Sequence, residues 1–186
     1  VAIKSCLKSM RASRLIQSIS LENFTKLYVK HRSIVTKKLY PQGSCRSRQF
    51  AFDGLLRELK VLNAYSHAER YERIYWENFL KEMKVSPEIK DFLIKVKKLG
   101  LTTCAVTDMQ ANFQIAKLKK LKLDQYIDYL VTSEEVGLEK PHPAIFQLAL
   151  KKMGLTKKKV VMIGDSNQKD IKGAASCGIQ GIYFKA

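Results

Sequence analysis

The chain has 186 residues, 46% of them hydrophobic, which is enough to bury one sizeable core or a core and a smaller unit. No run of about eighteen apolar residues occurs, so the sequence predicts no membrane-spanning helix. Its charged first residues do not resemble a signal peptide. The four cysteines are far apart and, with three scattered histidines, form no zinc pattern. We therefore expect a cytoplasmic protein without a membrane partner.

The formal charge of +17 is the most unusual feature of the composition. A strongly basic surface could attract nucleic acid or phosphorylated substrates. However, the lysines and arginines are spread singly or in short clusters, and no recognised nucleic-acid-binding motif accompanies them. We interpret most of the charge as solvated surface and do not expect a nucleic-acid partner, with a basic nucleic-acid-associated protein as an alternative. The sequence does not indicate an oligomeric state.

Residues 1–84 carry the periodicity of helices and few strand signals. Apolar residues recur at helical spacing from Ile3 to Ile19, and Ser20 is a suitable N-cap for the next helix. The chain is interrupted at Pro41–Gly43, because proline and glycine favour turns. A helical pattern resumes over 48–62. Ser66 and Glu69 form a capping box that predicts a further helix to about residue 83.

From Ser86 onward, helices and strands alternate. Ser86 is an N-cap followed by proline at the first helical position. The predicted strands are 101–106, 129–132, 160–163 and 181–184, and the predicted helices are 87–98, 111–121, 143–153 and one after Asp170. This alternation indicates an α/β fold with a parallel sheet and right-handed crossovers. The apolar run 160–163 is typical of a strand buried on both faces. The domain boundary is predicted near residue 85.

Polar side chains follow three of the strands or lie on the loops between them. Thr107 and Asp108 follow the first strand, where a hydroxyl and backbone N–H groups can bind phosphoryl oxygens. Lys140 lies between rigid prolines in GLEKPHP and can neutralise phosphoryl charge. Asp165 follows Gly164 at the end of the third strand, and Asp170 comes five residues later. Two carboxylates at this edge can hold a hard cation such as Mg²⁺.

These segments resemble the motifs of the haloacid dehalogenase-like hydrolase superfamily. Val106–Asp108 resembles its second motif, Lys140 in EKPHPAIF its third, and GDSNQKDIKGA at 164–174 its fourth. The resemblance implies a Rossmann-like parallel core at 85–186 and a helical cap domain at 1–84. It also implies a hydrolase that uses Mg²⁺ and a phosphoaspartyl intermediate on a small phosphorylated metabolite.

The resemblance assigns roles to individual residues. Thr107 would bind the phosphoryl group, and Lys140 would stabilise the nucleophile and the phosphate. Asp165 would ligate Mg²⁺, and Asp170 would support the metal site. Asp108 stands where the family often has asparagine, so its role is open, with phosphate binding as the expectation.

The fourth motif separates two subclasses. Family phosphatases carry Gly-Asp at its start, whereas true haloacid dehalogenases carry serine in place of the aspartate and need no metal. Gly164-Asp165 therefore favours a phosphatase. The following Ser166-Asn167 is similar to the dehalogenases, which leaves a 2-haloacid dehalogenase as a minor alternative.

The family's first motif, DxDxT after an apolar strand, supplies the nucleophile and does not occur in this sequence. The nearest match is Phe50–Leu56, where Ala51 would stand at the nucleophile and Leu55 at the threonine. Because this segment follows helical periodicity, we interpret it as a cap helix. We expect the nucleophile upstream of residue 1, on roughly 10–25 further residues that form a strand and a loop. The alternative is a catalytically inactive relative or fragment that binds a partner.

Overall fold

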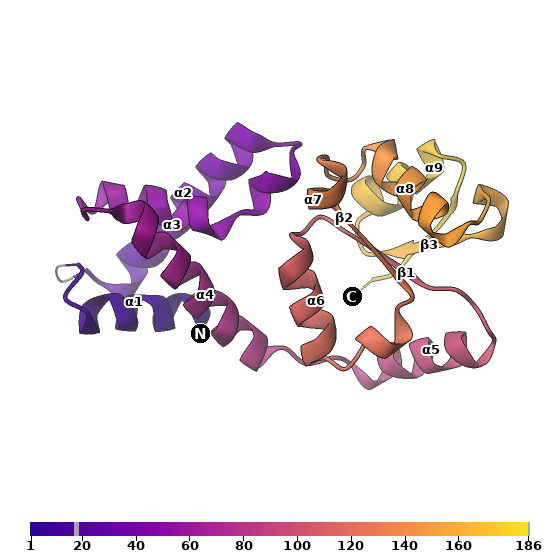
Figure 1. Ribbon diagram of the computed structural model, residues 1–186, viewed down its shortest axis with the longest axis horizontal. Helices are drawn as coiled ribbons and strands as arrows, with labels where there is room; N and C mark the ends of the chain where they lie inside the picture. The colour runs from indigo at the N-terminus through magenta and orange to yellow at the C-terminus, as the bar shows by residue number, and fades with distance from the viewer. Residues whose placement is uncertain (17–18, 186) are drawn as a thin grey trace. The chain divides into compact units, whose positions relative to one another are not determined.

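A computed structural model describes residues 1–16 and 19–185 of the chain (Figure 1). The chain divides into a helical unit, Val1–Tyr40 with Cys45–Lys84, and an α/β unit, Pro41–Ser44 with the chain from Val85 onward. The short segment Pro41–Ser44 thus belongs to the second unit although it lies within the sequence of the first. In the described part of the chain, no helix combines the length and apolarity that crossing a bilayer requires.

The helical unit contains four α-helices among its described residues: α1 (Ala2–Ala12), α2 (Leu21–Leu39), α3 (Arg48–Glu58) and α4 (Ala64–Glu82). Two of them begin as their sequences predict. The Ser20 hydroxyl caps α2 by accepting from the Asn23 N–H, and Ser47 caps α3 in the same way. The look-alike of the first motif lies on α3, as expected from its periodicity, and there Asp53 pairs with Arg57 one turn later.

Three helix boundaries predicted in this unit are wrong. The helix predicted over 48–62 ends at Glu58, because Lys60 takes a left-handed conformation (φ 57°). The first helix ends at Ala12, because Arg14 takes a left-handed conformation (φ 53°) that stops helical propagation; positions 17–18 of the predicted helix lie outside the described residues. The helix α4 begins at Ala64 rather than at a Ser66 cap. Its N-cap is Asn63, also left-handed, and the Ser66 N–H donates to the Asn63 carbonyl as part of the first turn.

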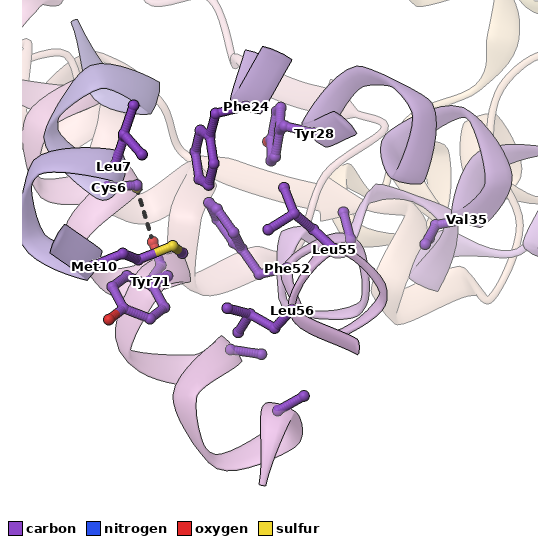
Figure 2. Packing of buried hydrophobic residues seen from close by; sticks show 13 residues of the cluster. Cys6, Leu7, Met10, Phe24, Tyr28, Val35, Phe52, Leu55, Leu56 and Tyr71 are labelled. Atoms are coloured by element: carbon purple, nitrogen blue, oxygen red, sulfur yellow. Dashed lines mark hydrogen bonds between the residues drawn. The ribbon is translucent and has the colours of Figure 1, made fainter. Parts of the chain in front are cut away.

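The core of the helical unit is centred on aromatic rings (Figure 2). The Phe52 ring of α3 is fully buried, 5.1 Å from the Tyr28 ring of α2 and 6.3 Å from the Tyr71 ring of α4 (centroid distances). Cys6 and Met10 of α1 complete this core. Two aromatic residues of α4, Tyr71 and Tyr75, therefore serve helix packing, which is the usual role of such side chains.

The α/β unit contains β1 (Cys104–Thr107), β2 (Tyr129–Thr132), β3 (Val161–Gly164), β4 (Gln180–Tyr183), α5 (Pro87–Lys98), α6 (Ala111–Lys120), α7 (Ser133–Val136), α8 (Pro143–Met153) and α9 (Lys172–Ser176). The four strands form two parallel pairs. Val106 of β1 pairs with Val131 of β2, and Ile163 of β3 pairs with Ile182 of β4. Within residues 1–16 and 19–185, no ladder joins the two pairs.

One core nevertheless supports both pairs of strands. Ile145 and Phe146 of α8 are buried together with Val131 of β2, and Val106 of β1 and Met162 of β3 pack against the same cluster. The helix α8 has the start and stop that its sequence predicts, since Pro143 is its first residue and Gly154 ends it in a left-handed conformation (φ 63°).

The prediction that the third strand is buried on both faces is wrong. Side chains of β3 alternate, so Met162 faces the core while Val161 and Ile163 are 44% and 42% exposed. The reason is that the hydrophobic core of this unit includes Met162 but neither Val161 nor Ile163, so among the described residues it covers one face of the strand only. A continuous apolar run is therefore compatible with a half-covered strand here.

The Phe52 site allows a test of the helical core. We expect Phe52→Ala to lower the free energy of unfolding by about 3–5 kcal/mol, because a fully buried ring leaves a cavity among helices α2, α3 and α4. Phe50→Ala on the same helix is the matched control, since Phe50 is 51% exposed and its removal should change stability by less than about 0.5 kcal/mol. Urea unfolding followed by circular dichroism measures both; equal losses would contradict the assignment of Phe52 as the core ring.

Candidate active site

The polar residues predicted from the sequence gather at the carboxyl ends of β1 and β3. Thr107 is the last residue of β1 and is followed by Asp108, while Gly164 ends β3 and is followed by Asp165. A direct hydrogen bond network links these two strand ends through Lys140. This is the edge where open α/β sheets bind ligands.

The Lys140 ammonium lies at the centre of the network. Its side chain is 11% exposed, and its Nζ donates to Asp170 Oδ1 at 2.6 Å and to the Val106 carbonyl of β1 at 3.0 Å. The other Asp170 oxygen accepts from the Ser166 N–H at 3.0 Å. Asp170 is 4% exposed and uses both oxygens, so this is a buried, well-satisfied ion pair.

Glycine is required before Asp165 for a reason that the structure makes plain. A Cβ on Gly164 would lie 2.5 Å from the Asp170 carboxylate, and therefore only glycine lets the end of β3 pass this close to the ion pair. The Gly164 backbone thus lies against the Asp170 side chain, which keeps Asp170 at the strand end that Asp165 follows. The sequence prediction placed them at one edge, and the structure brings them to the same end of β3.

Asp108 has a structural role that the sequence left open. Its Oδ1 accepts from the Lys140 N–H at 2.8 Å, and its Oδ2 accepts from Lys169 Nζ at 2.8 Å. Lys169 also donates to Glu139 Oε2 at 3.0 Å, and the Glu139 side chain is fully buried. Burial by itself would lower the pKa of Lys169, but its hydrogen bonds to Asp108 and Glu139 and their charges outweigh burial and raise that pKa.

Sequence reasoning missed Lys169 and Glu139. Each is the residue directly before one that was predicted: Lys169 precedes Asp170, and Glu139 precedes Lys140. Their position directly before a motif residue is the signal by which the sequence could have indicated them. In a chain with 34 lysines and arginines, however, one further lysine does not stand out.

Two predicted residues keep their polar groups available. Thr107 is half-buried and Asp165 is exposed. Among the residues that the structure describes, neither the Thr107 hydroxyl nor the Asp165 carboxylate has a hydrogen-bond or ion-pair partner. These two groups are therefore free to contact a ligand. Lys140 and Asp170 are already hydrogen-bonded to each other and to the backbone, and keep one ammonium N–H and the remaining carboxylate lone pairs.

The loop that carries Lys140 is held by the segment Pro41–Ser44. Gln42 forms an antiparallel bridge with Leu138, flanked by hydrogen bonds from the Gly43 N–H to the Gly137 carbonyl (3.1 Å) and from the Glu139 N–H to the Pro41 carbonyl (2.8 Å). We call this segment the strap. The predicted break at Pro41–Gly43 is thus an ordered element that fixes the backbone next to Lys140.

The donor set suits Mg²⁺. This ion is bound through one or two carboxylates, with water and substrate phosphate completing its coordination. Asp165 offers a carboxylate without a partner in the described chain, and the Asp170 carboxylate approaches the backbone of Gly164, the residue before Asp165. Within the described residues, no group of three histidine, cysteine, aspartate or glutamate side chains gathers around one point, so further ligands would have to come from water, substrate or another segment.

Comparison with known proteins identifies the family. The family model described as haloacid dehalogenase-like hydrolase matches residues 3–184. This chain belongs to the haloacid dehalogenase-like hydrolases. The match covers both the helical and the α/β units, so the resemblance inferred from motifs in the second half of the sequence is confirmed over nearly the whole chain. The expectation of a hydrolase is confirmed with it.

Curated relatives in this family are named as phosphatases. A ribulose-1,5-bisphosphate 5-phosphatase from Halopiger xanaduensis is 29% identical over 94% of this chain and 73% of its own length. A glyceraldehyde 3-phosphate phosphatase from Pyrococcus furiosus is 30% identical over 73% of this chain and 57% of its own length. This chain thus spans about three quarters of the first relative and little more than half of the second.

Solved structures of haloacid dehalogenase-like proteins share the fold. A phosphatase of this family from Thermococcus onnurineus aligns with a TM-score of 0.71 at 21% identity, covering 98% of this chain and 76% of that one. A 2-haloacid dehalogenase from Pseudomonas syringae pv. Tomato aligns with a TM-score of 0.75 at 20% identity, covering 98% and 79%. The predicted fold class, a Rossmann-like parallel core with a helical cap, is confirmed.

The strap can be tested at Gly43. A Cβ at this position would collide with the backbone of Ser133 and Glu134, so we expect Gly43→Ala to lift the strap and to destabilise the protein by about 1–3 kcal/mol. Amide hydrogen exchange gives the direct reading, because the Glu139 N–H loses the Pro41 carbonyl and should exchange faster. Ser44→Ala, an exposed neighbour, is the control and should leave that amide protected. Unchanged protection in Gly43→Ala would refute the role of the strap.

Proposed function

We propose that this protein is a Mg²⁺-dependent phosphatase that acts on a small phosphorylated metabolite in the cytoplasm, with the helical unit as its cap. The observation that carries the proposal is the pair of free groups, Thr107 and Asp165, on either side of the buried Lys140–Asp170 ion pair at one end of the strands. The phosphatase names of the relatives support the same conclusion.

Each residue of the site has a chemical task in this proposal. The Thr107 hydroxyl donates to a phosphoryl oxygen, and the Lys140 ammonium offsets the negative charge of the phosphoryl group. Asp165 would ligate Mg²⁺, and Asp170 would support the metal site through the lone pairs that its two hydrogen bonds leave. The ion would supply positive charge to the phosphoryl oxygens. Asp108 does not need to touch the substrate, because both of its oxygens already hold Lys140 and Lys169.

The nucleophilic aspartate is proposed to come from a segment that precedes Val1. The two separate pairs of strands support this placement. Among the described residues, β1 has a strand partner on one edge only, as does β3, and yet both pack on one core and Lys140 bridges β1 to Asp170 beyond the end of β3. A strand ending in DxDxT would pair with these free edges and place its carboxylates beside Lys140 and Asp165.

The alternative is a non-catalytic family member that keeps the fold and binds a partner. It follows from the lack of a DxDxT motif within these 186 residues. Sequencing the transcript upstream of the Val1 codon, together with the intact mass of the native protein, separates the two. An apolar strand with DxDxT supports the phosphatase, and a native chain that begins near Val1 favours the binding protein.

The metal role of Asp165 gives a direct test on the full-length protein. We expect Asp165→Asn to lower Mg²⁺-dependent hydrolysis of p-nitrophenyl phosphate on the order of a hundredfold, because a metal ligand is weakened where phosphoryl charge must be stabilised. Stability should not change, since the Asp165 carboxylate is exposed and has no partner in the described chain. Asp124→Asn, another exposed aspartate of the α/β unit, is the matched control. Equal activity of the two variants would sink the assignment.

A further inference from the structure

Lys169 joins two loops that are distant in the sequence. It lies on a single turn of π-helix, Asn167–Ile171, directly before α9. Its ammonium donates to Asp108 Oδ2 at 2.8 Å on the loop after β1, and to Glu139 Oε2 at 3.0 Å on the loop before α8. One cation thus contacts both loops that carry the proposed phosphate-binding groups.

Each of these contacts lies next to a residue of the proposed site. Asp108 follows Thr107, Glu139 precedes Lys140, and Lys169 precedes Asp170. The contacts form a closed ring, in which the Lys140 N–H bonds Asp108, Asp108 bonds Lys169, and Asp170, the neighbour of Lys169, bonds the Lys140 ammonium. Movement of one member therefore displaces the others.

The charges in this ring explain why a cation is needed between the two carboxylates. Glu139 is fully buried and the Asp108 side chain is 11% exposed, so water screens their repulsion weakly. Both accept from one ammonium, which places them close together. Lys140 follows Glu139 in the chain and its N–H donates to Asp108, so loss of the Lys169 ammonium would leave these two acids to compete with Asp170 for the Lys140 ammonium.

We propose that Lys169 is a positioning residue, which holds Asp108 and Glu139 so that the Lys140 ammonium stays on Asp170 and on the Val106 carbonyl. The inference rests on the proposed function only for its effect on turnover. The positional claim itself concerns the Lys140 side chain and can be measured without any substrate.

The first experiment measures the exposure of the Lys140 amine in the full-length protein. Wild type and Lys169→Met are treated with N-hydroxysuccinimidyl acetate, and the acetylation rate of each lysine is read by peptide mass spectrometry. Lys152, which pairs with Glu135 elsewhere in the same unit, is the internal reference. We expect Lys140 in Lys169→Met to react on the order of tenfold faster, because a local opening becomes more populated when one of its restraints is lost.

Two further variants make the result specific. Lys169→Arg keeps the charge and its donors, so it should restore the slow reaction of Lys140. Lys172→Met removes a lysine from the exposed start of α9, and in this variant Lys140 should be acetylated at the wild-type rate. If Lys169→Met does not fold, Asp108→Asn replaces it, because this change keeps an acceptor for the Lys140 N–H and removes the charged partner of Lys169. Asp108→Asn should then also accelerate the acetylation of Lys140.

Kinetics of p-nitrophenyl phosphate hydrolysis complete the test. We expect kcat of Lys169→Met to fall on the order of tenfold while KM stays within about twofold, with recovery in Lys169→Arg. A rise in KM with kcat unchanged would overturn the proposal and make Lys169 a substrate ligand. An unchanged Lys140 reaction rate in the folded variants would overturn it as well. If no variant, wild type included, hydrolyses the ester but Lys140 reacts faster in Lys169→Met, the phosphatase proposal fails and the positioning role stands.

Discussion

The buried ion pair between Lys140 and Asp170 is the interaction on which the α/β unit's organisation depends. A charged pair taken out of water is favourable only when its remaining hydrogen-bonding groups are satisfied. Here the Val106 carbonyl accepts a second N–H of the ammonium, and the Ser166 N–H donates to the second oxygen of Asp170. The pair therefore fixes three segments at once: the end of β1, the loop before α8 and the turn after β3. The glycine at 164 and the strap at 41–44 can be understood as the backbone adjustments that make this meeting possible.

The site contains two kinds of polar residue: some hold the protein's own loops in place, and others are available to bind a ligand. Asp108, Glu139 and Lys169 have their charges directed at one another, whereas Thr107 and Asp165 point polar groups at no protein partner in the described chain. This division is typical of a preorganised site, in which bound groups keep the reactive ones in place before a ligand arrives. It also accounts for the aspartate at 108, because a carboxylate pairs with the Lys169 ammonium more strongly than a neutral side chain would.

The sequence predicted the elements with strong local signals and missed features set by distant contacts. Ser20, Ser86 and Gly154 mark helix ends by capping or by a left-handed stop, and each lies where expected. The predicted start of α4 is wrong because Asn63 takes a left-handed conformation that no local pattern indicates. The exposure of β3 and the partners of Lys169 depend on segments far away in the chain, which periodicity does not report. The motif residues are predictable because their spacing is specific, whereas their hydrogen bonds depend on how distant segments of the chain fold together.

The strap has a consequence for the order in which the protein is made. Its partners Gly137, Leu138 and Glu139 leave the ribosome long after Pro41–Ser44 does. The helical unit can complete its aromatic core early, since all four helices precede residue 85. The backbone groups of the strap then remain hydrated until residues 137–139, their hydrogen-bond partners, have been synthesised. Formation of the loop that carries Lys140 is thereby a late step, and the ion pair with Asp170 can assemble only after residue 170 has been synthesised.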